Sequence, residues 1–255
     1  MKLEASFVKS AASAADFPRD GWSEVALVGR SNVGKSSLIN ALVRQRLART
    51  SAAPGKTRLV NIYGIARGSA APFYLVDLPG YGYARGGHRA AEEFGALTRG
   101  YFGRVGQVGQ VGRVGSVGKY RPGLPALPDR PALPDPPDPP AHRIAAILLL
   151  DARHPGLDSD RMAWQWLQAA VEGAAALVAT KIDKLARGER ISAMRKLESV
   201  FENSVLPVSA VTGEGLDELW KLIDSLANNP LRHRRRAATA PPSHPRKKAQ
   251  QLRRK

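Results

Sequence analysis

One short segment restricts the possible folds of this chain more than any other. The apolar residues 25–28 of an expected strand over 24–29 lead into Gly29-Arg30-Ser31-Asn32-Val33-Gly34-Lys35-Ser36. This segment matches the pattern G-x-x-x-x-G-K-[S/T] and is followed by a helical pattern. The glycines let backbone N–H groups wrap a phosphate, and the N-terminus of the helix adds positive potential. The segment therefore predicts a phosphate-binding loop between a strand and a helix. The alternative is a glycine-rich turn without a ligand.

Five side chains or backbone groups in or near this segment carry the expected chemistry. Lys35 would reach the β- and γ-phosphates of a nucleotide, and the Ser36 hydroxyl would bind Mg²⁺. In Asp77-Leu78-Pro79-Gly80, which follows another apolar run, the carboxylate would hold Mg²⁺ through water and the Gly80 N–H would sense a γ-phosphate. Thr57, in a loop over 54–58, is placed to complete the Mg²⁺ coordination. We therefore expect Lys35, Thr57 and Gly80 to be catalytic, and Ser36, Thr57 and Asp77 to hold the metal.

A second group of motifs indicates the base. Thr180-Lys181-Ile182-Asp183 is close to the N-K-x-D pattern, in which the carboxylate accepts hydrogen bonds from the N1–H and exocyclic amine of guanine. Adenine offers no matching donors. Ser209-Ala210 would add a backbone N–H to guanine O6. The full set of residues expected to contact the nucleotide is Gly29, Arg30, Ser31, Asn32, Val33, Gly34, Lys35, Ser36, Gly55, Lys56, Thr57, Arg58, Leu59, Asp77, Leu78, Pro79, Gly80, Thr180, Lys181, Ile182, Asp183, Val208, Ser209 and Ala210.

Short aliphatic runs alternate along the chain with longer helical patterns, which predicts an α/β fold: a six-stranded, mostly parallel sheet flanked by helices. The expected strands are 24–29, 59–66, 73–77, 144–151, 175–180 and 205–208, and the expected helices are 35–44, 92–101, 158–170, 188–201 and 215–227. A short turn separates the second and third strands, so we expect an antiparallel hairpin at the sheet edge. Such sheets bind ligands at the carboxyl ends of their strands, where the motifs above fall.

Two segments differ from the rest in composition. Residues 103–141 contain five glycine triplets and then a proline-dense stretch, which predicts a surface insertion. The stretch Arg232–Lys255 holds ten Lys or Arg and no acid, within a chain of net charge +17 (39 − 22). This tail suits a phosphate-binding arm for nucleic acid, the alternative being a solubilising segment. We expect a lead-in over 1–23, a main domain over 24–227 interrupted by the insertion, and a disordered basic tail over 228–255.

Composition also excludes several classes of protein. The 255 residues include no Cys, so disulfides, thiolate-bound zinc, iron–sulfur clusters and cysteine nucleophiles are ruled out. The longest strongly apolar run, 144–150, is far shorter than the roughly 20 residues that span a bilayer. We therefore expect a cytoplasmic protein without a membrane span.

Taken together, the motifs resemble those of the EngB (YihA/YsxC) family of ribosome-biogenesis GTPases. The resemblance is carried by Gly29–Ser36, by Pro54–Arg58 and above all by Asp77-Leu78-Pro79-Gly80-Tyr81-Gly82-Tyr83-Ala84, with support from Asp151–Pro155, Thr180–Asp183 and Gly213–Gly215. It covers roughly 5–102 and 142–227 and implies a P-loop NTPase fold of the G-domain type. Thr180 in place of the commoner Asn is usual in this family.

The resemblance implies a Mg²⁺-dependent protein that binds GTP and GDP and acts in assembly of the large ribosomal subunit. We expect a monomer. It also implies a need for the protein in normal cell division and septation. A basic tail is physically consistent with ribosomal RNA as the partner, which would make the protein ribosome-associated.

Two positions bear on hydrolysis. Tyr81 follows the Asp77–Gly80 motif directly, where many GTPases carry a water-orienting glutamine, so we expect slow turnover. Asn32 falls where potassium-activated relatives hold a monovalent cation, and a role confined to the loop turn is the alternative to a K⁺ site. Two rival interpretations stay open: a non-enzymatic rRNA-binding or division-site scaffold with a structural nucleotide pocket, and an Era-like GTPase acting on small-subunit or transfer RNA.

Overall fold

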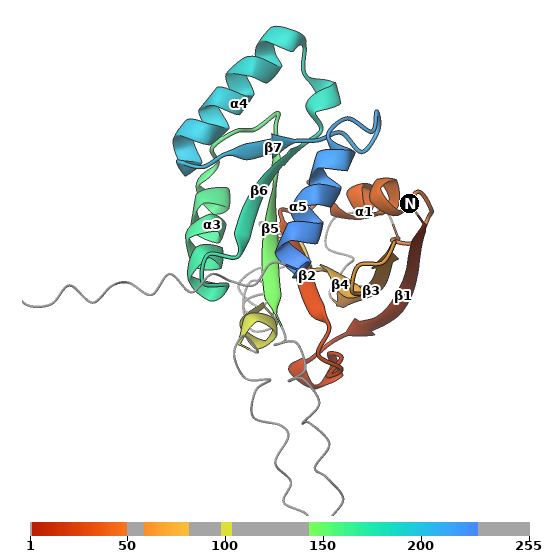
Figure 1. The fold of residues 1–255 in the computed structure, drawn as a ribbon. Helices are drawn as coiled ribbons and strands as arrows, with labels where there is room; N and C mark the ends of the chain where they lie inside the picture. Colours follow the sequence, from red (N-terminus) through yellow and green to blue (C-terminus); the bar gives the residue numbers. More distant parts are fainter. Residues whose placement is uncertain (1, 50–58, 82–97, 104–142, 229–255) are drawn as a thin grey trace, which may run out of the picture.

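The computed structural model describes residues 2–49, 59–81, 98–103 and 143–228, and one twisted sheet runs through its centre (Figure 1). The sheet has seven strands in the order β1-β3-β4-β2-β5-β6-β7. The strands are β1 (Leu3–Ala11), β2 (Ser23–Gly29), β3 (Val60–Arg67), β4 (Phe73–Asp77), β5 (Ile144–Asp151), β6 (Ala175–Thr180) and β7 (Val205–Pro207). From β4 to β7 every neighbouring pair is parallel, so the carboxyl ends of these strands meet at one edge.

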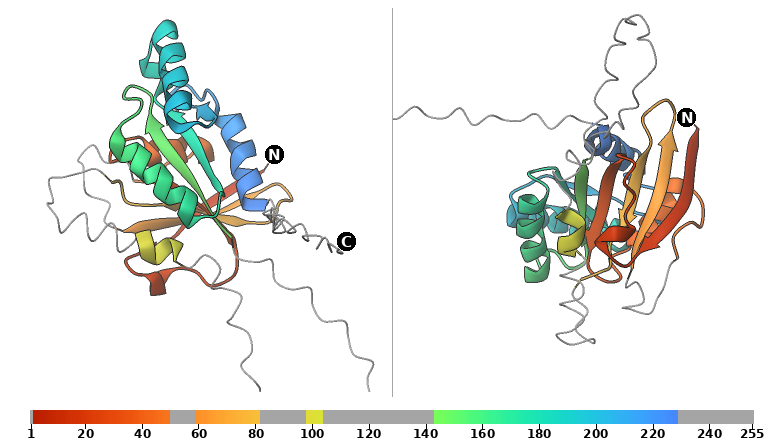
Figure 2. Two further views of the ribbon diagram at one scale, coloured as in Figure 1. Left: turned by 90° about the vertical axis from the view of Figure 1, so that its left-hand side faces the viewer. Right: turned by 90° about the horizontal axis from the view of Figure 1, so that it is seen from below.

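Helices cover both faces of the sheet, as the two views of Figure 2 show. On one face α1 (Lys35–Val43) and α5 (Leu216–Asn228) pack, and on the other α3 (Asp158–Ala170) and α4 (Arg187–Phe201) pack. The side chains of a strand alternate between these two layers, so Val25 and Leu27 of β2 belong to the first core, and Ala26 and Val28 to the second. All eight residues of β5 are buried, as expected for a strand covered on both faces.

Two shorter pieces complete the described chain. Residues 98–102 form a helical segment whose aromatic side chains join the core beneath α3. The 3₁₀ turns η1 (Ala14–Asp16) and η4 (Ile182–Lys184) lie before β2 and after β6. In the part of the chain that the structure describes, no helix is long and apolar enough to cross a membrane.

The N-terminal segment corrects two expectations. The sheet has seven strands and not six, because the expected lead-in contributes β1, which pairs antiparallel with β3. The hairpin of β3 and β4 is antiparallel as predicted, but it does not form the sheet edge, since β1 lies outside it. Most side chains of β1 are exposed and only Ala11 is buried, so backbone pairing with β3 holds this strand together with limited apolar contact from Leu3, Ala5 and Phe7.

The other predicted elements with printed bounds agree with the structure to within one residue at each end. Of the predicted helix over 92–101, only the last residues are described, and these are helical. The proposed insertion over 103–141, apart from its first residue, and the basic tail, apart from residue 228, lie outside the described residues.

Candidate functional site

The predicted phosphate-binding loop connects the end of β2 to the start of α1, at the carboxyl edge of the sheet. Gly34 precedes the helix with a φ of 111°, a left-handed conformation that favours glycine. Gly29 packs so closely on β5 that a Cβ there would lie 2.9 Å from the carbonyl oxygen of Leu149. Both glycines of the pattern are therefore required by the geometry of this loop.

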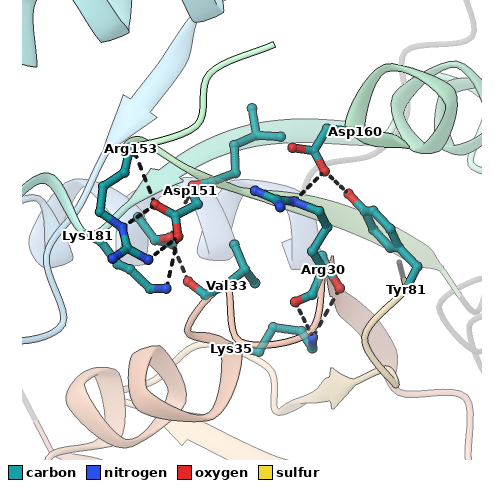
Figure 3. Close-up of polar contacts among 11 residues, drawn as sticks. Arg30, Val33, Lys35, Tyr81, Asp151, Arg153, Asp160 and Lys181 are labelled. Atoms are coloured by element: carbon teal, nitrogen blue, oxygen red, sulfur yellow. Dashed lines mark hydrogen bonds and ion pairs between the residues drawn. The ribbon is translucent and has the colours of Figure 1, made fainter. Parts of the chain in front are cut away.

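Lys35 lies beneath the loop and is almost entirely buried. Its Nζ donates to the carbonyl oxygens of Gly29 (3.1 Å) and Arg30 (3.4 Å), as Figure 3 shows. Burial lowers the pKa of Lys35, and the nearby negative charge of Asp77 opposes this shift. An ammonium group has three donors, and the described residues accept from only two of them. The third is left for an anion in the loop.

Asp77 and Ser36 form a pair of oxygen donors beside Lys35. The Ser36 hydroxyl donates to Asp77 Oδ2 at 3.3 Å. The Oδ1 atom of Asp77 is buried, and no group in the described ranges donates to it. Burial raises the pKa of Asp77 to about 6, against the lowering effects of Lys35 and of the Ser36 hydrogen bond. A buried carboxylate oxygen without a donor, next to a hydroxyl, fits a hard cation such as Mg²⁺, which prefers oxygen ligands.

The other residues expected to bind the metal or the phosphates form two groups, one outside the described residues and one within them. Gly55, Lys56, Thr57 and Arg58 lie outside the described residues. Leu59 is described and exposed, whereas Leu78 and Pro79 are buried where β4 meets the loop. The structure thus brings Lys35, Ser36, Asp77 and Gly80 together.

The predicted base-reading residues meet at the ends of β6 and β7. The Thr180 hydroxyl donates to the carbonyl oxygens of Val33 (2.8 Å) and Leu150 (3.1 Å) and so joins β6 to the phosphate loop. Ser209 Oγ donates to Asp183 Oδ1 at 2.7 Å. This hydrogen bond lowers the pKa of Asp183, so its carboxylate is ionised at neutral pH and can accept hydrogen bonds.

The backbone around these groups is also fixed. Ser209 Oγ accepts hydrogen bonds from the N–H groups of Val211 (3.2 Å) and Thr212 (3.1 Å), which closes the loop after β7. Ile182 and Val208 are buried behind this loop, and Ala210 is partly exposed beside it. The groups expected to read guanine are therefore held by hydrogen bonds and packing.

Lys181 connects the base-reading segment to the phosphate loop. Its Nζ donates to the carbonyl oxygen of Asn32 at 2.5 Å. It also donates to Asp151 Oδ2 at 2.9 Å (Figure 3). Arg153 donates to both carboxylate oxygens of Asp151, at 2.9 and 2.8 Å. Burial alone would raise the pKa of Asp151, but hydrogen bonds from Arg153 and Lys181 hold it well below its usual range.

This ion cluster gives a prediction for stability. The variant Asp151→Asn is expected to lower the free energy of unfolding near neutral pH by about 2 kcal/mol, because Lys181 and Arg153 lose their shared carboxylate. The folded-state pKa of Asp151 is depressed. Its contribution is therefore present above the ordinary carboxyl pKa of about 4 and is lost as the pH falls below that value.

Urea unfolding of both proteins across this range measures the effect. The difference between them should shrink as the pH falls below about 4. Asp158, whose side chain is 92% exposed, provides the matched control Asp158→Asn. A difference for Asp151→Asn that stayed constant with pH would contradict its origin in the ion cluster.

Sequence reasoning gave no role to two buried carboxylates at this site, Asp151 described above and Asp160. Asp160, in the first turn of α3, is 1% exposed and accepts a hydrogen bond from the Tyr81 hydroxyl at 2.8 Å. The same oxygen lies 3.2 Å from Nε of Arg30, which comes from the phosphate loop. A signal was present in the sequence, because Asp160 shares one face of the helix with the apolar Trp164 and Leu167, at spacings of four and three residues.

Comparisons with known proteins agree with this geometry. A family model described as 50S ribosome-binding GTPase matches residues 24–102. The "Probable GTP-binding protein EngB" of Chlorobaculum parvum is 36% identical over 223 residues, which cover 86% of this chain and 95% of that protein. Its counterpart from Thermotoga maritima is 35% identical over 223 residues, 86% of this chain and 94% of that protein.

Solved structures show the same fold. A crystal structure of Era from Aquifex aeolicus, bound to GDP and AlF4⁻, aligns with a TM-score of 0.58 and 19% identity. It matches 82% of this chain, but the aligned part is 58% of Era. A crystal structure titled as a probable GTP-binding protein engB aligns with a TM-score of 0.53 and 18% identity over 82% of this chain and all of that one. At these identities the structures support the fold alone.

Proposed function

The chain belongs to the EngB family of GTP-binding proteins, and from this premise we propose that it is a GTP-driven switch in assembly of the large ribosomal subunit. The observation that carries the proposal is the meeting of Lys35, Asp77 and Asp183 at one edge of the sheet, with the chemistry for phosphate, metal and guanine. The matched family model, whose description names binding to the 50S ribosome, supports the choice of subunit.

In this proposal, each group has one role. Lys35 and the loop N–H groups bind the β- and γ-phosphates, Asp183 with Ser209 reads guanine, and the Gly80 N–H senses the γ-phosphate. Ser36, Thr57 and, through water, Asp77 would hold Mg²⁺, which when bound neutralises charge that develops on the phosphates. Catalysis by Lys35, Thr57 and Gly80 is accordingly electrostatic, and turnover is slow because a tyrosine replaces the water-orienting glutamine.

The same proposal covers the partners. The basic tail Arg232–Lys255 would contact rRNA on the large subunit, and the protein would act as a cytoplasmic monomer needed for cell division and septation. Asn32 has a φ of 63°, and its backbone carbonyl accepts a hydrogen bond from Lys181. Both features belong to the turn of the phosphate loop. A potassium ion at Asn32 stays a hypothesis from the sequence.

Sedimentation with purified ribosomal subunits tests the switch. We expect the protein to co-migrate with the large subunit in the presence of a non-hydrolysable GTP analogue and to be released with GDP. A chain ended after Asn228, which keeps all of α5, should bind more weakly and with less salt dependence, because the tail neutralises phosphates. Binding to the small subunit instead would favour the Era-like alternative.

A second outcome would overturn the proposal in another way. Binding that ignored the nucleotide and vanished with the tail would mean that charge alone makes the contact, as in the scaffold alternative. In that case variants at Asp183 would leave cellular function intact.

A further inference from the structure

The turn after β4 is joined to the phosphate loop by its backbone. Ser31 N–H donates to the carbonyl oxygen of Tyr81 at 3.0 Å, and Tyr81 N–H donates to that of Gly29 at 3.3 Å. The Ser31 hydroxyl reaches the carbonyl oxygen of Gly80 at 3.3 Å. A Cβ on Gly80 would lie 2.6 Å from Ser31 N, so only glycine allows this approach. The two segments therefore form one small ladder.

Within this ladder the N–H of Gly80 is in a distinct position. The N–H groups on either side are used, since Leu78 donates to Leu27 (3.2 Å) and Tyr81 donates to Gly29. Among the described residues, none accepts a hydrogen bond from the N–H of Gly80. Its peptide is thus held in place while its donor is left for a ligand, and this is the donor assigned above to the γ-phosphate.

One carboxylate oxygen holds the side chains at both edges of the ladder. Asp160 Oδ1 accepts from the Tyr81 hydroxyl and pairs with Arg30 Nε, and Figure 3 shows both side chains converging on it. Burial raises the pKa of Tyr81, so the phenol keeps the proton that it donates. The tyrosine side chain therefore points to α3 and anchors the turn.

We propose that Asp160 is a positioning residue that holds Tyr81 and Arg30 so that the Gly80 N–H is aligned for the γ-phosphate before nucleotide binds. This inference rests on the proposed GTP switch and deepens the role of Gly80 in it. Prior alignment removes an ordering cost from binding, and only a ligand with a γ-phosphate gains from it. Asp160 and Tyr81 thereby determine how strongly the site favours GTP over GDP.

The variant Tyr81→Phe removes only the anchoring hydroxyl. Loss of one hydrogen bond to a buried carboxylate is expected to weaken binding of a non-hydrolysable GTP analogue by about five- to tenfold. Affinity for GDP should stay within about twofold, since GDP makes no contact with the Gly80 N–H. Titrations of fluorescent GDP and of the analogue, both with Mg²⁺, measure the ratio of the two affinities.

A matched control lies on β4, the strand that precedes the turn of Tyr81. Tyr74 of β4 also donates its hydroxyl to a carboxylate, that of Asp20, at the end of the strand away from the phosphate loop. The variant Tyr74→Phe makes the same chemical change, and it should leave the ratio of affinities unaltered. A general loss of structure would instead weaken the affinities for GDP and for the analogue by the same factor in either variant.

The variant Asp160→Asn separates the two contacts of the carboxylate. Asn keeps an oxygen for the Tyr81 hydroxyl but removes the charge that pairs with Arg30, so the ratio should shift in the same direction as in Tyr81→Phe. The double variant should lose less than the product of the single losses, because both act through one anchor. Equal loss for both nucleotides, no loss, or tighter binding of the analogue would overturn the positioning role.

The wild-type measurement separates this inference from the proposed function. A wild-type protein that bound neither GDP nor the analogue would overturn the switch itself. Normal wild-type binding with an unchanged ratio in Tyr81→Phe would overturn only the anchor.

Discussion

The variant Asp183→Asn is expected to bind GDP about a hundredfold or more weakly than the wild-type chain, while its affinity for xanthosine diphosphate rises. The carboxylate, held by Ser209 and kept ionised, is a pure acceptor. An amide of the same shape turns one acceptor into a donor, which faces the donors of guanine. Xanthine carries a carbonyl where guanine carries its amine, so it matches the amide. Competition titrations against a fluorescent guanine nucleotide measure both affinities.

Binding of the xanthine nucleotide is also the internal control, because it shows that the variant is folded and its phosphate loop intact. Ser209→Ala removes the hydroxyl that orients the carboxylate and should produce a smaller loss of GDP affinity, on the order of tenfold. If GDP and adenosine diphosphate were bound equally by the wild-type chain, the assignment of this site to guanine would be wrong.

The second large effect concerns stability. Gly215, between the base-reading loop and α5, has a φ of 76°, and a Cβ there would lie only 2.2 Å from the carbonyl oxygen of Pro207. The variant Gly215→Ala combines left-handed strain with a clash against the backbone of β7. We expect it to lower the free energy of unfolding by about 3–5 kcal/mol. Chemical denaturation with detection by circular dichroism measures the loss.

Gly213 provides a matched control two residues away. Its φ of 81° is nearly the same, but no atom lies within 4 Å of the position of a Cβ. The variant Gly213→Ala should therefore cost only the backbone strain, about 1–2 kcal/mol. Both changes reduce the entropy of the unfolded chain equally, so the difference between them isolates the clash. Equal losses of unfolding free energy in the two variants would mean that the backbone of β7 moves away from the added Cβ without a cost in stability.

Much of the sheet could be predicted because its strands are buried on both faces. A run such as 144–150 is apolar throughout, which indicates a central strand without knowledge of its neighbours. The strand β1 could not be predicted in the same way. Leu3, Ala5 and Phe7 alternate with polar residues over only five positions, and the pairing of the strand depends on the hydrogen-bonding groups of β3, which a linear pattern does not reveal.

The candidate site was predictable where its chemistry is local in the chain. The loop from Gly29 to Ser36 needs glycine, lysine and serine at fixed spacing, so the pattern alone indicates its shape. The role of Asp160 in supporting the site was not predicted. Asp158 and Asp160 stand two residues apart in the first turn of α3, and the first is exposed whereas the second is buried. The spacing of Asp160 to Trp164 and Leu167 places it on the buried face of α3, but its contacts with Tyr81 and Arg30 depend on the tertiary structure.

The links from Thr180 and Lys181 to the phosphate loop bear on how the parts of a nucleotide cooperate. Each residue donates to a loop carbonyl, that of Val33 or Asn32, so the two ends of the ligand meet one connected frame. Once the diphosphate is seated, the base is presented to Asp183 at a high effective concentration. The translational entropy of the ligand is then lost once for both ends. A guanine nucleotide should therefore bind more tightly than the binding free energies of guanosine and pyrophosphate, measured separately and added, would indicate.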